Sequence, residues 1–104
     1  MAMTPEKKMK KKVDEVLKEH GIWFFAPQAG IYGRSGIPDR VGILPGGRMI
    51  AVEVKAGTKY GLTALQEKTI KEMIDAGAFC WVVKDEESLV GLKAWLRING
   101  ANKC

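Results

Sequence analysis

The sequence predicts an α/β domain with a mixed central sheet and the element order α-β-β-β-α-β-α. Apolar residues recur at helical spacing in residues 5–20, 62–77 and 86–98. Shorter apolar runs, rich in β-branched and aromatic residues, lie between these segments. The 104 residues have the length of one domain, and 46% apolar residues are enough to fill one core. We therefore expect a single domain over residues 1–104.

The first predicted helix, residues 5–20, carries a strongly basic surface. Thr4 is a candidate N-cap, Pro5 suits the first helical position, and Gly21 ends the helix. One face is apolar and packs inward. The other faces carry lysines: Lys7, Lys8, Lys10, Lys11 and Lys12.

A β-hairpin is predicted in the middle of the chain. Residues 40–44 and 48–55 are strand-like, and the Pro-Gly-Gly sequence at 45–47 is a turn between them. A short aromatic strand, residues 22–25, precedes the hairpin. The glycine-rich residues 27–36 connect the two as a loop.

The second half of the chain predicts a helix, a buried strand and a final helix. Thr63 is a candidate N-cap, and Gln66 three residues later completes a capping box. Residues 78–83 are almost continuously apolar, which is typical of a strand covered on both faces. That strand follows a long helix, so we expect a parallel crossover connection.

The charge balance favours a polyanionic partner. Lys and Arg number 17 against 12 acids, a formal charge of +5, and basic side chains placed on phosphates release counterions. A basic domain without such a partner explains the charge equally well. The two cysteines, Cys80 and Cys104, predict neither a disulfide framework nor a zinc site. With no apolar stretch long enough for a membrane span and no signal peptide, we expect a cytoplasmic protein.

Three charged residues of the hairpin are the candidate catalytic group. Glu53 and Lys55 point to the same side of one strand because side chains alternate along a strand. Asp39 begins the partner strand, and the turn at 45–47 can place it near both. A half-exposed hairpin with solvated charges is the alternative explanation.

An Asp and a Glu held close together repel each other, and a hard divalent cation relieves the repulsion. Carboxylate oxygens suit Mg²⁺ or Mn²⁺, which stabilises charge on phosphoryl oxygens. An adjacent lysine can position an attacking water and stabilise developing negative charge. Asp39, Glu53 and Lys55 are therefore sufficient for metal-dependent phosphodiester hydrolysis.

Pro38-Asp39 followed by Glu53-Val54-Lys55 resembles the PD-(D/E)XK nuclease signature. The surrounding sequence, over roughly residues 6–90, resembles the VRR-NUC family in its small stand-alone form, as found in phages. The matching segments are Ser35-Gly36-Ile37-Pro38-Asp39, Gly46-Gly47, Gly61-Leu62-Thr63-x-x-Gln66 and Gly77. The resemblance implies a restriction-endonuclease-like core, whose element order agrees with the one predicted above.

The resemblance also implies further site residues. Family members carry an acid on the first helix near the metal. Glu6, Glu15 and Glu19 are available, and we favour Glu6 because it shares the apolar stripe of the helix. Glu6 could instead be only a helix-start acid favoured by the dipole. The Val54 carbonyl could ligate the metal together with Asp39 and Glu53. Gln66 could hydrogen-bond the catalytic lysine or a metal-bound water, besides its capping role.

Several basic and aromatic residues are candidate DNA contacts. Arg34, Lys59 and Tyr60 lie in loops that flank the proposed site, although solvated loop residues would look the same. Lys8 and Lys11 are candidate contacts on the lysine face of the first helix.

For the single histidine, His20, a capping or surface role is favoured over catalysis. Three tryptophans fit either the core or an interface: Trp23, Trp81 and Trp95.

The resemblance implies a structure-selective DNA endonuclease, and stand-alone members act as Holliday-junction resolvases. Symmetric cuts would come naturally from a two-fold homodimer. One alternative is a nucleic-acid-binding module that does not cleave. Others are a restriction-like nuclease that reads a duplex sequence, and a subunit active only with a partner. If the chain is phage-encoded, the host-cell cytoplasm is its expected location.

Overall fold

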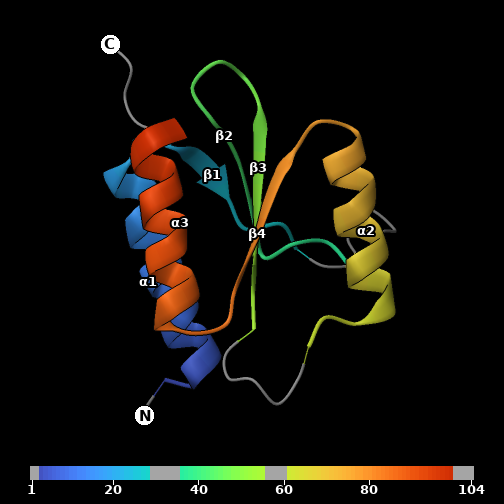
Figure 1. Cartoon of the computed structure of the whole chain (residues 1–104). Coiled ribbons are helices and arrows are strands. Elements are labelled where there is room, and N and C mark those ends of the chain that lie inside the picture. The colour runs from blue at the N-terminus through green and yellow to red at the C-terminus, as the bar shows by residue number, and fades with distance from the viewer. Residues whose placement is uncertain (1–2, 29–35, 56–60, 100–104) are drawn as a thin grey trace.

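A computed structural model describes residues 3–28, 36–55 and 61–99 (Figure 1). The elements follow the predicted order α-β-β-β-α-β-α. They are α1 (Pro5–Glu19), β1 (Trp23–Phe25), β2 (Arg40–Ile43), β3 (Met49–Val54), α2 (Ala64–Asp75), β4 (Phe79–Val83) and α3 (Glu86–Asn99).

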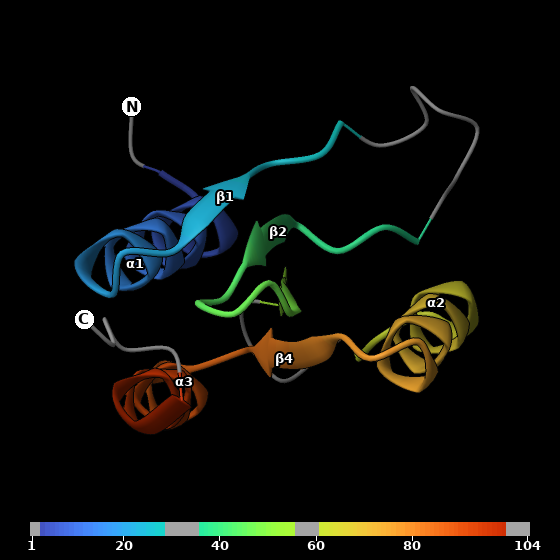
Figure 2. The same ribbon diagram turned by 90° about the horizontal axis from the view of Figure 1, so that it is seen from above.

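The strands form one mixed sheet in the order β1-β2-β3-β4. The pairs β1–β2 and β2–β3 are antiparallel, whereas β3–β4 is parallel and is connected through α2. The predicted crossover is therefore confirmed. Figure 2 shows α1 and α3 on one face of the sheet and α2 on the other, displaced towards β4. Within the described residues, no helix is long and apolar enough to cross a membrane.

The helix ends are held by the predicted local contacts. The Thr4 hydroxyl accepts a hydrogen bond of 3.2 Å from the Lys7 amide at the start of α1. His20 caps the other end, with its Nδ1 2.8 Å from the Val16 carbonyl, so the capping role is confirmed. At the start of α2 the capping box is complete, because Thr63 and Gln66 each bond the other's amide through a side-chain oxygen.

The core lies between the sheet and the α1–α3 layer. Alternation along β3 points Ile50, Val52 and Val54 into this core, where all three are fully buried. Phe79 of β4 stacks on Trp95 of α3 with 3.5 Å between ring centroids. Trp81 also packs against this core. Its indole N–H donates to the Ser88 carbonyl at 2.8 Å.

The tryptophans therefore divide. Trp81 and Trp95 belong to the core, whereas Trp23 of β1 is 64% exposed on the opposite face of the sheet. The sequence left core and interface open for all three residues, and burial separates them.

Gly36 fixes the approach of the chain to the Pro38-Asp39 motif. Its φ is +76°, a conformation that L residues with a side chain rarely adopt. A Cβ at this position would lie 3.0 Å from the Leu65 carbonyl oxygen and 3.1 Å from the Thr69 hydroxyl. The absence of a side chain thus lets this segment lie against α2.

Replacement of Gly36 by alanine should lower the free energy of unfolding by about 1–3 kcal/mol, because the backbone strain at positive φ and the clash of the added Cβ with α2 both destabilise the folded state. Urea denaturation of the two proteins measures the difference. Gly61→Ala is the matched control, since an added Cβ there meets nothing within 4 Å and the glycine φ is not positive. Equal stability of G36A and G61A would contradict this account of the motif's position.

Candidate active site

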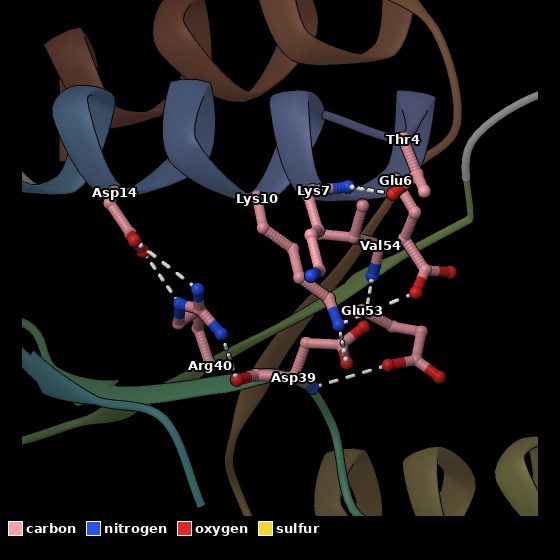
Figure 3. A network of polar contacts seen from close by, with 9 residues as sticks. All are labelled: Thr4, Glu6, Lys7, Lys10, Asp14, Asp39, Arg40, Glu53 and Val54. Carbon is pink, nitrogen blue, oxygen red and sulfur yellow. Dashed lines mark hydrogen bonds and ion pairs between the residues drawn. The ribbon is translucent and has the colours of Figure 1, made fainter. Parts of the chain in front are cut away.

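The structure brings Asp39 and Glu53 together at one end of the β2–β3 hairpin. The register pairs Arg40 with Val52, so the next residues along the two strands, Asp39 and Glu53, face each other. The Asp39 amide donates to Glu53 Oε1 at 3.2 Å, and the Val54 amide donates to Asp39 Oδ2 at 2.7 Å (Figure 3). Two backbone N–H groups thus hold the two carboxylates in place.

Glu53 is a buried acid that resists ionisation. Only 3% of the residue is exposed, and it lies on the face of β3 opposite the apolar core. Burial, followed by the hydrogen bond and negative charge of Asp39, raises the pKa of Glu53 to about 8, although the Lys55 charge opposes this. Near neutral pH and without a metal, Glu53 is therefore largely protonated.

Asp39 is the partner that keeps the negative charge. Burial alone would raise its pKa. Hydrogen bonds from Glu53 and from the Val54 amide, with the charge of Lys10, outweigh burial and hold the pKa of Asp39 below its usual value. The two acids therefore share one proton, as expected of closely spaced carboxylates.

A charged stripe on α1 faces this pair. Glu6, Lys10 and Asp14 are spaced four residues apart, so they lie on one side of the helix. Lys10 Nζ is 3.4 Å from Asp39 Oδ1 and 3.4 Å from Glu6 Oε2. Glu6 therefore reaches Asp39 through Lys10 in this structure, while Figure 3 shows its side chain beside the site.

Arg40 is a positioning residue that the sequence reasoning missed. Its Nε and Nη2 lie 2.6 and 3.2 Å from the two carboxylate oxygens of Asp14, and its Nη1 donates to the Asp39 carbonyl at 2.9 Å. This bidentate pair connects α1 to the start of β2. The four-residue spacing of Asp14 from Lys10, and the position of Arg40 directly after Asp39, were the available signals.

A solved structure described as a VRR_NUC domain has the same fold. The TM-score is 0.76 at 28% sequence identity, and the match covers 86% of this chain and 95% of that chain. This match supports membership of the VRR-NUC family. No family model and no curated protein matches the chain. VRR-NUC membership implies a nuclease of the PD-(D/E)XK type, and the predicted restriction-endonuclease-like core is confirmed.

The other predicted site residues lie in different parts of the structure. Lys55 directly follows β3, and its amide donates to the Val83 carbonyl at 2.8 Å. The Gln66 amide oxygen accepts from the Thr63 amide at 2.9 Å, so this oxygen serves the helix cap. Lys8 and Lys11 are exposed on α1. Three of the candidate DNA contacts lie outside the described residues: Arg34, Lys59 and Tyr60.

The donor set suits a hard cation. Asp39 and Glu53 supply carboxylate oxygens. The Val54 N–H points towards β2. The Val54 carbonyl points in the same direction, because the N–H and C=O of one strand residue lie on the same side of the strand. Extending the register places Pro38, which has no N–H, opposite Val54. The described residues contain no cluster of three or more His, Cys, Asp or Glu, but Mg²⁺ commonly uses only one or two protein carboxylates.

The metal-free protein should lose stability as the pH rises. In the folded chain the pKa of Glu53 is about 8, against an ordinary value of 4.5. The folded state therefore binds this proton more tightly than the unfolded state, and the stabilisation disappears as the pH passes from about 5 to about 9. The lowered pKa of Asp39 acts in the opposite direction only at lower pH, near its ordinary value of 3.8.

Thermal melts in EDTA across this pH range measure the effect. Wild type should lose several degrees more than Glu53→Gln, which has no proton to release. Glu87→Gln, an exposed acid on α3, should keep the wild-type slope. If wild type and E53Q changed in parallel, Glu53 would not have the raised pKa described here.

Proposed function

We propose that this VRR-NUC domain is a Mg²⁺- or Mn²⁺-dependent, structure-selective DNA endonuclease that acts as a homodimeric Holliday-junction resolvase. The observation that carries the proposal is the close Asp39–Glu53 pair, in which Glu53 is buried, with Lys55 on the same side of the hairpin. A close, partly buried acid pair that shares one proton is costly without a cation, and active sites often keep such pairs.

In this mechanism Asp39, Glu53 and the Val54 carbonyl hold the cation, with Glu6 as a further acid from α1. The bound cation supplies Lewis-acid stabilisation of the charge on the phosphoryl oxygens. Lys55 positions the attacking water and stabilises negative charge in the transition state. Gln66 supports Lys55 from the first turn of α2, while Arg40 keeps the Asp39 backbone in place.

The basic surface of α1 provides a route for DNA to the site. Lys8 and Lys11 are exposed on the helix that carries Glu6 and Lys10, and the chain has a formal charge of +5. Phosphate contacts from these lysines would bind DNA without reading its sequence. We assign the same role to Arg34, Lys59 and Tyr60. Contacts to the DNA backbone alone fit a nuclease that selects DNA by its shape.

An apolar sheet face supports the homodimer. It consists of Trp23, Phe25, Ile43 and Met49, all exposed, and the strand register places Trp23, Ile43 and Met49 side by side. Among the described residues, α2 covers only the β4 side and leaves a groove of about 730 Å³ beside Phe25 and Met49. A second copy could bury this face, because a two-fold contact brings identical patches together.

The nuclease proposal is tested with a labelled four-way junction and a matched linear duplex, each in Mg²⁺, Mn²⁺ and EDTA. We expect paired, metal-dependent nicks on the junction alone. Asp39→Asn, Glu53→Gln and Lys55→Met should each slow cleavage by about a hundredfold or more, because each removes a ligand or a transition-state contact. Glu87→Gln, an exposed acid on α3, should cut at the wild-type rate.

The other outcomes separate the alternatives. Equal cutting of duplex and junction would retain the nuclease and reject the resolvase. Sequence-dependent cutting of the duplex would indicate a restriction-like enzyme. If neither wild type nor E53Q cleaved DNA and both bound it equally well, the binding module or a subunit that needs a partner would be favoured.

The dimer proposal predicts a mass near twice 11.5 kDa, about 23 kDa, by light scattering. Trp23→Asp should shift the protein to monomer, because the charge would be buried without a partner. Ile98→Asp is the matched control, since Ile98 is 70% exposed on α3, in the layer on the opposite face of the sheet. A wild-type monomer, or a dimer that persists in W23D, would reject this interface.

A further inference from the structure

Lys10 occupies a position where a cation is needed. Its ammonium lies 3.4 Å from Asp39 Oδ1 and 3.4 Å from Glu6 Oε2 (Figure 3). The other oxygen of Asp39, Oδ2, accepts from the Val54 amide. The lysine therefore faces the Asp39 oxygen that this backbone bond does not hold, on the side of the site nearest α1.

We propose that Lys10 is a displaceable counter-cation of the acidic site. In the metal-free protein its ammonium neutralises Asp39, and it must leave Asp39 when a divalent cation binds. Competition with Lys10 then sets the apparent metal affinity. This inference rests on the proposed function, because it requires that Asp39 and Glu53 bind a divalent cation.

The side chain of Lys10 is suited to moving. The side chain is 28% exposed, so it is partly in contact with solvent, and its four-carbon stem is flexible. Glu6, one turn earlier and more exposed, offers a second partner that Lys10 can keep after leaving Asp39. Arg40 cannot take this role, since its guanidinium is held in a bidentate pair with Asp14.

Mutual exclusion follows from charge. An ammonium and a divalent cation that approach the same carboxylate oxygen repel each other strongly at such short separation. A purely structural ion pair would behave differently, because its loss would weaken the fold and leave metal binding unchanged or weaker. Displacement instead predicts opposite signs: lower stability without metal and tighter metal binding.

The test is calorimetric titration of the DNA-free protein with MnCl₂ at a single pH, together with melts in EDTA. Lys10→Met should bind Mn²⁺ about threefold to tenfold more tightly than wild type, and should melt at a lower temperature in EDTA. Lys10→Arg keeps the charge and the reach, and should stay close to wild type.

Lys18→Met is the matched control. Lys18 is exposed on the same helix, eight residues and about 12 Å further along, so its loss removes the same charge from a distant point. Its Mn²⁺ affinity should remain within about twofold of wild type, because exposed charges about a Debye length away are screened. Circular dichroism establishes that each variant is folded before titration.

The outcomes distinguish the two proposals. If wild type binds Mn²⁺ and K10M binds it no more tightly than K18M does, the role of Lys10 is overturned and the metal site remains. If neither wild type nor K10M binds Mn²⁺, the proposed function fails together with this inference. Tighter binding by K10M alone supports displacement.

Discussion

The hydrogen bond from the Val54 amide to Asp39 is the contact on which the site depends. It joins the start of β2 to the end of β3 at 2.7 Å, and the Asp39 amide completes the connection through Glu53. β3 is held on both sides, by β2 in antiparallel and by β4 in parallel pairing. The site is therefore built on a central strand that is paired on both sides, and such a rigid element holds side chains in a precise geometry.

This arrangement has an energetic cost. Two acids lie close together, and one of them is almost fully buried, so ionising both is unfavourable. The structure answers with a shared proton and with positive charge from Lys10 and Lys55. Arg40, paired with Asp14, adds a fixed bidentate connection between α1 and the start of β2. In the proposed function a divalent cation replaces the proton and supplies the missing charge.

The two sides of the sheet differ in what they offer. The side covered by α1 and α3 contains the core, and α1 presents exposed lysines beyond it. The other side is covered by α2 near β4 and, among the described residues, leaves Trp23 and Phe25 exposed on β1. DNA and a second copy of the chain would thus be recognised by chemically different surfaces, one cationic and one apolar, in keeping with the proposed resolvase.

Local physics explains why the sequence alone determined the elements and the core of the site. Helical spacing, the Thr63–Gln66 capping box and the turn at 45–47 act over a few residues, so they predict the helices and the hairpin without tertiary information. The hairpin in turn brings Asp39 to Glu53. What only the tertiary structure decided is the docking of α1 on the sheet. That docking depends on how buried residues such as Val13 and Leu17 pack, and it alone places Lys10 against Asp39 and Asp14 against Arg40. Packing also decided which aromatic residues are buried, because alternation along a strand divides its side chains between two faces but does not say which face a helix covers.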